Sequence, residues 1–438
     1  MSQNTDRILV SHVDSLPRPH DLSDMMKARL TGEGAPVDED AYQARVTRAI
    51  AETVKQQADS GIVTDGEISK PGFFVYIQER LAGFEPRPAD KYSLYTAERD
   101  AFPEYYEEYF ARAMLGGRIA PIVKIFAVEP IRYIGEEALK RDLANLRAAV
   151  DAARCARAFV PSTAPSGVGF NEYYKDDEEF FHALGEAMSA EYKAIVEAGF
   201  DVQIDDPFLS DIFGDPALDD KAKVRKADIF VESVNTALRD IPEENIRFHT
   251  CYGINEGPRI YEPQLGEVIE HIYRIKASVY SFEAANPRHE HDYHVFEQNK
   301  LPAGKAIMPG VITHASNIVE HPELIAEWLV RFAGLVGREN VIAGADCGFS
   351  SQACYHTEVH PTVIWAKLEA MAEGARIASE KLRGLRQSPP RFNSATYLPL
   401  SRLRERAGRM RATAGKASDG GGASATLSPS PSRTRERV

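Results

Sequence analysis

The chain has 438 residues, of which 43% are hydrophobic and 27% are charged, the composition of a globular protein with one large domain or two ordinary ones. Its net charge is −13, and because residues 386–438 contain 11 Lys and Arg against 3 Asp and Glu, residues 1–385 carry −21. So acidic a body argues against a nucleic-acid groove, and no apolar run approaches the roughly 20 residues that a membrane helix needs.

The N-terminus and the cysteines indicate the compartment. No basic region followed by an apolar core opens the sequence, so no secretory signal is visible. The four cysteines are too few and too scattered for a disulfide framework. We therefore expect a cytoplasmic protein without nucleic-acid or membrane partners, in a reducing compartment where a thiolate can hold a metal ion.

Short apolar and β-branched runs alternate with amphipathic segments along most of the chain. The runs that predict strands are residues 8–13, 61–64, 119–126, 158–161, 200–204, 246–248, 278–282, 305–312 and 340–343. The helical segments between them include residues 39–61, 176–199, 223–238, 265–276 and 322–335. This alternation predicts parallel β/α organisation. The weakest of the nine strand candidates, 119–126, is interpreted as a side hairpin with residues 129–134.

Two regions divide the chain by composition. Residues 1–385 are predicted to form a single domain. Residues 386–438 are basic and rich in Gly, Ser, Pro and Arg, a composition typical of disorder.

Polar and metal-ligating side chains follow five of the predicted strands. They are Asp65 and Glu67, Asp205 and Asp206, His249 and Cys251, Glu283, and Asp346 and Cys347. A doubly wound sheet gathers ligands only near its switch point, whereas a (β/α)₈ barrel places the carboxyl ends of all its strands on one rim. The pattern therefore predicts an α/β protein with a TIM-like barrel. No glycine-rich nucleotide motif supports nucleotide binding.

The segment 246–253 carries the clearest metal motif. His249 and Cys251 lie two residues apart at the end of a strand-like run, so on an extended backbone their side chains point to the same side. With Glu283 and Cys347, which end two other runs, they offer one nitrogen, two sulfurs and one carboxylate, a set that suits Zn²⁺. The simpler alternative is that both cysteines are small buried hydrophobes and His249 is a core histidine.

Two other histidine clusters favour a plainer interpretation. His289, His291 and His294 lie in a charged stretch that we interpret as a solvated loop, and the His356/His360 pair lacks the Glu placement of the hydrolytic zinc motif. The Tyr- and Glu-rich segment 92–109 interrupts the β/α rhythm; it is either surface packing or a rim insertion that covers the site.

At this point the residues resemble a known family. The body, residues 8–385, resembles the catalytic barrel of cobalamin-independent methionine synthase and its single-domain relatives, which include epoxyalkane:coenzyme M transferase. The motifs that carry the resemblance are Ser-His-Val-Asp-Ser-Leu-Pro-Arg-Pro at 11–19, Asp-Gly-Glu-Ile-Ser-Lys-Pro-Gly-Phe at 65–73, Gln-Ile-Asp-Asp-Pro at 203–207, His-Thr-Cys-Tyr at 249–252, Glu283, and Asp-Cys-Gly-Phe at 346–349.

The resemblance implies a zinc-dependent methyltransferase of methionine biosynthesis. It implies zinc held by His249, Cys251, Glu283 and Cys347, with the substrate thiol joining the metal as a thiolate and being alkylated there. A bound metal lowers the pKa of a thiol and keeps it nucleophilic near neutral pH.

The resemblance also implies roles for residues that touch the acceptor. Glu67 and Asp205 would hold the amino group of homocysteine, and the turn at Ser15 would meet its carboxylate through backbone N–H groups. His314 follows Pro-Gly-Val at 309–311 one position earlier than the family's proton donor, and it is our candidate general acid. Asp14 stands where the family usually has Gly.

Three functions are weighed. The favoured one is methyl or alkyl transfer to a small thiol, most simply homocysteine to methionine, from a donor that the sequence does not identify. The alternative within the enzyme class opens an epoxide with coenzyme M, whose sulfonate needs a cation such as Lys70, whereas Glu67 and Asp205 favour an amine. The third is a non-catalytic, zinc-stabilised barrel that binds a metabolite.

Overall fold

The fold is described from a computed structural model. It describes residues 7–34, 36–58, 61–73, 75–88, 95–112, 117–254 and 256–384. All of them lie in one compact unit, Met1–Gln387. The prediction of disorder for residues 386–438 lies outside the described residues. In the described part of the chain, no helix is both long and apolar enough to span a membrane.

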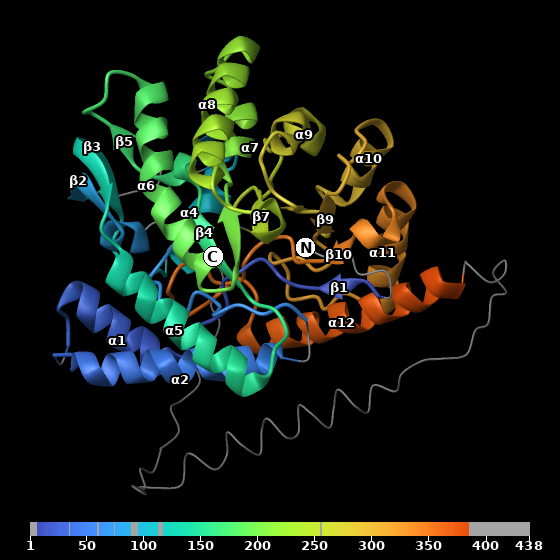
Figure 1. Cartoon of the computed structure of the whole chain (residues 1–438), viewed down its shortest axis with the longest axis horizontal. Helices are drawn as coiled ribbons and strands as arrows, with labels where there is room; N and C mark the ends of the chain where they lie inside the picture. The colour runs from blue at the N-terminus through green and yellow to red at the C-terminus, as the bar shows by residue number, and fades with distance from the viewer. Residues whose placement is uncertain are drawn as a thin grey trace, which may run out of the picture. The chain divides into compact units, whose positions relative to one another are not determined.

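Eight strand segments pair in parallel and close into a barrel. In Figure 1 their colours run from blue at β1 to orange at β10. The strands are β1 (Leu9–Val10), a short segment at 62–63, β4 (Phe159–Thr163), β6 (Asp201–Asp205), β7 (Ile246–His249), β8 (Val279–Phe282), β9 (Ala306–Pro309) and β10 (Ile342–Ala343).

The pairing of neighbouring strands closes the barrel, with the first strands of the chain hydrogen-bonded to the last ones. Strands β4, β6, β7, β8 and β9 pair in chain order, all of them parallel. Single bridges join β9 to the β10 region, and β10 pairs in parallel with β1. Val10 then accepts a hydrogen bond from the amide of Ile62 (2.9 Å), and Val63 pairs with Ala158. The predicted (β/α)₈ barrel is confirmed.

Helices follow the strands and cover the barrel. The long ones are α1 (His20–Thr31), α2 (Glu39–Gln57), α5 (Glu136–Ala153), α6 (Asp177–Glu197), α8 (Asp220–Leu238), α9 (Leu265–Tyr273), α11 (Pro322–Val336) and α12 (Pro361–Gly384). Short helices are α3 (Thr96–Ala101), α4 (Pro103–Arg112), α7 (Phe208–Gly214) and α10 (Val295–Gln298), and one-turn 3₁₀ segments lie at Tyr76–Glu79, Pro165–Gly167, Glu243–Asn245, Glu290–His294 and Arg338–Asn340.

Aspartate caps explain where three of the helices begin. The side chains of Asp38, Asp176 and Asp219 accept hydrogen bonds from backbone amides three residues later, at 2.8, 3.0 and 2.8 Å. Each cap satisfies an amide that the first helical turn leaves unpaired. At the other end of α6, Gly199 takes the left-handed conformation (φ 83°) that commonly follows the end of a helix.

The side hairpin exists, but its predicted pairing is wrong. β3 (Val123–Tyr133) runs continuously through residues 126–129 and pairs antiparallel with β2 (Leu81–Pro88), a strand that the sequence analysis missed. β5 (Phe170–Asn171) adds to the other edge of β3. Two prolines and a glycine make residues 81–88 resemble a loop, yet prolines are tolerated on an edge strand.

A buried arginine links opposite sides of the barrel interior. Arg247 on β7 lies with its guanidinium 3.8 Å from the ring centre of Phe159 on β4. It donates to Ser11 Oγ and to the carbonyl of His12, both at 3.0 Å, just after β1. These contacts give both terminal nitrogens of the guanidinium polar partners in the apolar core, while Nε has none among the described residues.

Candidate functional site

All the predicted site residues lie beyond the carboxyl ends of barrel strands. Ser15 follows β1, Glu67 and Lys70 follow the segment at 62–63, and Asp205 ends β6. The others are His249 and Cys251 at the end of β7, Glu283 after β8, His314 after β9 and Cys347 after β10. One rim therefore carries every candidate, as a barrel active site requires.

Three of the four predicted metal ligands converge. One ligand atom each of His249, Cys251 and Cys347 lies within 4.8 Å of the other two, and all three residues are buried. The residues come from β7 and from the loop after β10, 98 positions apart in the chain between His249 and Cys347. The simpler reading of these residues as unrelated core groups does not predict such convergence.

One ring nitrogen of His249 has a hydrogen-bond partner, and the other is available to a ligand such as a metal ion. Its Nδ1 lies 3.0 Å from Ser281 Oγ, on the neighbouring strand, and its Nε2 is buried without a partner among the described residues. Burial, with the charge of Arg247, lowers the pKa of His249 to about 3. A neutral imidazole oriented through one nitrogen and free at the other is a standard metal ligand.

The two thiols also need a cation if they are to ionise. Hydrogen-bond contact with Cys251, then burial, raises the pKa of Cys347 well above its usual range. Asp14 and Glu283 add to this effect through their negative charges. A divalent ion reverses this balance because it stabilises thiolates directly. The donor set, one nitrogen and two sulfurs, fits zinc.

Glu283 belongs to an adjacent group rather than to the three ligands. Its carboxylate clusters with those of Asp346 and the ring of His314. Arg259 Nη2 lies 2.8 Å from Oε2 and 3.0 Å from Oε1 of Glu283, and Asn286 donates to Oε2 at 2.8 Å. Protein donors thus engage both oxygens of the carboxylate that the resemblance assigns to the metal.

Arg259 is the main site residue that the sequence analysis missed. It is 4% exposed, has a positive φ of 59°, and also binds Glu262 through Nε at 2.6 Å. Its Nη1 is buried without a partner in the described part of the chain. Arg259 has a left-handed backbone conformation and lies in a loop, so the hydrophobic periodicity of the sequence does not single it out. Its position directly after a Gly-Pro pair does indicate a turn.

Glu67 and Asp205 each leave one carboxylate oxygen free. Glu67 Oε1 accepts a hydrogen bond from Lys70 Nζ at 3.0 Å, and Asp205 Oδ1 accepts one from Gln203 Nε2 at 2.8 Å. Glu67 Oε2 and Asp205 Oδ2 are buried and have no hydrogen-bond partner among the described residues. Burial, reinforced by Asp14 and Glu67, raises the pKa of Asp205 well above its usual range. An unpaired buried acceptor calls for a donor from a ligand.

The ammonium group of Lys70 already has partners within the protein. Besides Glu67, its ammonium group donates to the carbonyl of Pro161 at 2.7 Å and lies 4.3 Å from the ring centre of Tyr76. The side chain is 6% exposed. The structure therefore places Lys70 as a counter-charge to Glu67.

Ser15 lies in the predicted turn, but its amide is taken. The backbone N–H of Ser15 donates to Asp14 Oδ1, and Ser15 Oγ accepts a hydrogen bond from the amide of Ser350 at 3.2 Å. The carbonyl of Ser15 accepts from Phe349 at 2.9 Å. The turn is thus joined to the loop that carries Cys347.

His314 is buried and belongs to the second group, beside Glu283 and Asp346. Its Nε2 lies 3.1 Å from the carbonyl oxygen of Gly253, and its Nδ1 has no partner among the described residues. A carbonyl only accepts, so Nε2 carries the proton and Nδ1 presents a lone pair. Burial and the charge of Arg259 hold the pKa of His314 well below its usual range.

The insertion before β3 covers the cysteines. Tyr95 and Phe110, at the two ends of the α3–α4 segment, pack against a buried cluster that contains Cys251 and Cys347. Glu98 accepts a hydrogen bond from the amide of Ile260 at 2.6 Å, and Tyr109 donates to Glu358 at 2.6 Å. The rim-insertion interpretation of the Tyr-rich segment is the one that the structure supports.

The other histidines do not form metal sites in the described residues. His289 is buried, bonded to Asp292 (2.8 Å) and Glu262 (3.0 Å), and stacked on Tyr252 at 4.1 Å. The solvated-loop interpretation is therefore wrong for His289, although the His291 and His294 side chains are more than half exposed. His360 bonds to Thr362 just before α12.

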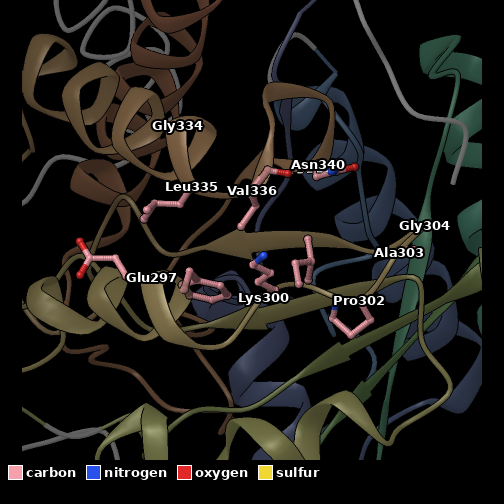
Figure 2. Close-up of a pocket in the computed structure, with 11 residues that line it drawn as sticks. Glu297, Lys300, Pro302, Ala303, Gly304, Gly334, Leu335, Val336 and Asn340 are labelled. Carbon is pink, nitrogen blue, oxygen red and sulfur yellow. Dashed lines mark hydrogen bonds between the residues drawn. The ribbon is translucent and has the colours of Figure 1, made fainter.

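A separate hollow lies away from these residues. Figure 2 shows a surface pocket of about 390 Å³, lined by residues of the α10–β9 connection and by the end of α11 with Asn340. It precedes β9 and β10, at the amino end of the barrel, and none of the predicted site residues lines it.

Known proteins resemble the chain over most of its length. Residues 166–373 match the family described as cobalamin-independent synthase, catalytic domain. A methionine synthase from Saccharolobus solfataricus is 22% identical over 379 residues, which cover 85% of this chain and 95% of that protein. A methionine synthase from Sulfurisphaera tokodaii is 23% identical over 397 residues, which cover 89% of this chain and 96% of that protein.

Two solved structures share the fold. A B12-independent methionine synthase from Shewanella sp., in complex with selenomethionine, has a TM-score of 0.65 and 20% identity, and covers 86% of this chain and 99% of that one. A putative vitamin-B12 independent methionine synthase from Listeria monocytogenes has a TM-score of 0.60 and 18% identity, with the same coverage. The chain thus matches the catalytic domain of the cobalamin-independent synthase family over residues 166–373, and it shares the fold of two B12-independent methionine synthases.

Proposed function

We propose that this protein transfers a methyl or alkyl group to the sulfur of a small, amine-bearing thiol, in the manner of a zinc-dependent methionine synthase. Homocysteine is the acceptor that its relatives favour, since the curated proteins it resembles are methionine synthases. The observation that carries the proposal is the convergence of His249, Cys251 and Cys347 on the barrel rim.

His249, Cys251 and Cys347 would hold zinc, with Glu283 as the further ligand that the family resemblance implies. Zinc bound there would lower the pKa of the acceptor thiol, so that its sulfur is nucleophilic near neutral pH. Ser281 supports this role by orienting the ring of His249. Arg259 and Asn286 hold the carboxylate of Glu283 beside the three ligands.

Glu67 and Asp205 would bind the amino group of the acceptor. Their free oxygens, Oε2 and Oδ2, are buried acceptors that an ammonium group can satisfy with its three N–H donors. Lys70 Nζ donates to Oε1 of Glu67 at 3.0 Å and places a positive charge beside that carboxylate. Two carboxylates in a buried pocket strengthen this contact, because the local dielectric is low.

His314 would move the proton. Its unprotonated Nδ1 can pass the proton of the incoming thiol to the buffer, and a proton that the same atom takes up later can be given to the leaving group of the donor. The general-acid role predicted from the sequence would thus follow a first step in which His314 acts as a base. The insertion formed by residues 95–112 packs over Cys251 and Cys347 through Tyr95 and Phe110 and would limit the access of water to the ligands.

The coenzyme M alternative fits less well. A sulfonate needs a free cation, but Lys70 is engaged by Glu67, the Pro161 carbonyl and the Tyr76 ring. The carboxylates of Glu67 and Asp205 would repel the sulfonate.

Calorimetric titration of the zinc-loaded protein tests the proposal. Homocysteine and coenzyme M would be added separately, in two buffers of different ionisation enthalpy, with metal-stripped protein as control. We expect homocysteine to bind with release of about one proton and only when zinc is present. Binding of coenzyme M alone would favour the epoxide-opening alternative, and no binding of either thiol would contradict the proposal.

A further inference from the structure

Asp346 joins the turn after β8 to the loop after β10. Its side chain is buried, and its Oδ1 accepts hydrogen bonds from the backbone amides of Ala284 and Ala285, both at 2.8 Å. These two alanines directly follow Glu283, and Cys347 directly follows Asp346. One carboxylate therefore ties together the two backbone segments that carry these predicted metal ligands.

The side-chain amide of Asn286 lies between two carboxylates. Its Nδ2 donates to Asp346 Oδ2 at 3.0 Å and to Glu283 Oε2 at 2.8 Å, which uses both of its hydrogens. Its Oδ1 accepts from the backbone amide of Arg288 at 3.0 Å, so the side-chain nitrogen and oxygen cannot exchange places without losing these hydrogen bonds. Asp346 thus helps to fix the direction from which Asn286 meets Glu283.

The hydrogen bonds of Asp346 favour a supporting role over a role as a metal ligand. One ligand atom of Asp346 lies within 4.8 Å of those of Glu283 and His314, so these three residues are also candidate ligands of a second metal. However, Oδ1 of Asp346 already has two amide donors, which engage both of its lone pairs. A Cβ atom at Gly310 would lie 2.0 Å from the same oxygen, so the backbone after β9 also packs directly against it.

We propose that Asp346 is a positioning residue: through Asn286 and the amides of residues 284–285, it holds the carboxylate of Glu283 beside the three converging ligands. The inference rests on the proposed function, because it presumes that those ligands bind a metal. Loss of such support typically weakens metal binding by about 10- to 100-fold, since the unsupported ligand must be ordered when the metal binds.

Cobalt(II) is the probe for the first test, because its absorption spectrum reports both affinity and coordination geometry. Metal-stripped full-length protein would be titrated with cobalt in competition with a chelator. Asp346→Asn keeps the shape and one oxygen for the two amides, but its new NH₂ group faces the NH₂ group of Asn286. We expect the dissociation constant for cobalt to rise by about 10- to 100-fold. At saturation the thiolate-to-cobalt band should keep its intensity, because both cysteines remain, while the d–d bands should shift.

Asn286→Ala is the second variant, and it removes the bridge while Asp346 keeps its two backbone contacts. It should also raise the dissociation constant for cobalt, by about tenfold or more. The double variant should bind cobalt no more weakly than the weaker of the two single variants, because both changes act through Glu283. A general loss of stability would not produce this non-additivity.

Asp206→Asn is the matched control. Asp206 is also 0% exposed and follows a barrel strand, and its Oδ1 likewise accepts from two successive amides, those of Phe208 and Leu209, both at 3.0 Å. These amides begin α7 and do not belong to the turn that carries Glu283. The affinity for cobalt should therefore stay unchanged in this variant.

The outcomes distinguish the inference from the function on which it rests. Weaker cobalt binding and shifted d–d bands in the Asp346 and Asn286 variants, with an unchanged Asp206 control, support the inference. Unchanged binding in Asp346→Asn, or an equal loss in Asp206→Asn, overturns it and leaves the transferase function standing. A second bound cobalt that Asp346→Asn loses would make Asp346 a ligand and would also overturn the inference.

The unaltered protein tests the metal site itself. If cobalt gives no thiolate-to-cobalt band with the unaltered protein, the proposed function is overturned, and the inference with it. If Asp346→Asn fails to fold, the Asn286→Ala variant decides, and unchanged cobalt binding in that variant overturns the inference.

Discussion

Arg259 and Glu283 form a buried ion pair at the centre of the site, with Nη2 of the arginine 2.8 Å from Oε2 of the glutamate. Their side chains are 5% and 0% exposed. Burial raises the pKa of Glu283 to about 7, although Arg259 opposes the shift. The pair is thus a charge interaction that depends on both partners.

Replacing one partner should be costly. Arg259→Met leaves a buried carboxylate without its cation, and we expect the free energy of unfolding to fall by about 3–5 kcal/mol. The double variant Arg259→Met with Glu283→Gln should cost less than the sum of the single changes, because no unpaired charge remains. Urea denaturation of the four proteins in the metal-free state measures the coupling; simple additivity would contradict this account.

The cysteines offer a clean test of the metal ligands. Cys251→Ser or Cys347→Ser should weaken zinc binding by more than about 100-fold and abolish transferase activity, because each change removes a sulfur donor. The circular dichroism spectrum should stay that of a folded barrel, since serine is close to cysteine in size. Zinc content after gel filtration is the measurement.

Cys354→Ser is the matched control for these variants. Cys354 is buried in the same cluster, but its sulfur donates to the carbonyl of His356 at 3.3 Å and is not one of the three converging ligands. Full zinc retention by both the Cys251 and Cys347 variants, or loss of zinc from the Cys354 variant, would show that the site is wrongly assigned.

The barrel and its rim were predictable because they depend on regular patterns. The sequence shows strand periodicity alternating with helix periodicity, and a polar residue at the end of each strand. These patterns can be recognised whatever conformation the loops adopt. The convergence of His249 with Cys347 follows from the topology alone, because strands β7 and β10 end on the same rim. The pairing of β2 was missed because its register with β3 shifts at Gly83 (φ 97°), where residues 128–131 of β3 have no regular partners, and hydrophobic periodicity does not predict such a shift.

The charge partners inside the site were not predictable in the same way. Arg259 reaches Glu283 from a loop 24 residues earlier, and Asp14 reaches the Ser15 amide beside it. Such contacts are set by side-chain directions in irregular segments. Ser281 is the exception that a sequence argument could have found, because it lies opposite His249 in the β7–β8 register.

The 95–112 insertion should control access to the cysteines. Tyr109 is 2% exposed, and its hydroxyl donates to Glu358 at 2.6 Å and accepts from the amide of Glu256 at 3.2 Å. Tyr109→Phe removes both bonds and should weaken docking of the insertion by about 1–3 kcal/mol. Hydrogen exchange of residues 96–112 should then be faster, while exchange in the barrel strands stays unchanged.

Tyr173→Phe is the control for this change, since Tyr173 is 50% exposed and lies outside the insertion. Unchanged exchange in the Tyr109 variant would mean that apolar packing of Tyr95 and Phe110, not these hydrogen bonds, holds the insertion in place.

His289 should make stability depend on pH. Burial alone would lower its pKa, but hydrogen bonds to Asp292 and Glu262 raise the pKa to about 9. A histidine with a raised pKa contributes stability that is fully present below the unfolded value of about 6.5 and is lost as the pH rises through 9. His289→Asn removes this contribution.

The excess stability of the unaltered protein over the His289→Asn variant should therefore shrink by about 2–3 kcal/mol between pH 6.5 and pH 9. Urea unfolding of metal-free protein at the two pH values measures it. His294→Asn, at a largely exposed position, provides the comparison. A constant difference between the unaltered protein and the His289 variant across this range would mean that His289 is neutral in the folded state and acts only by stacking on Tyr252.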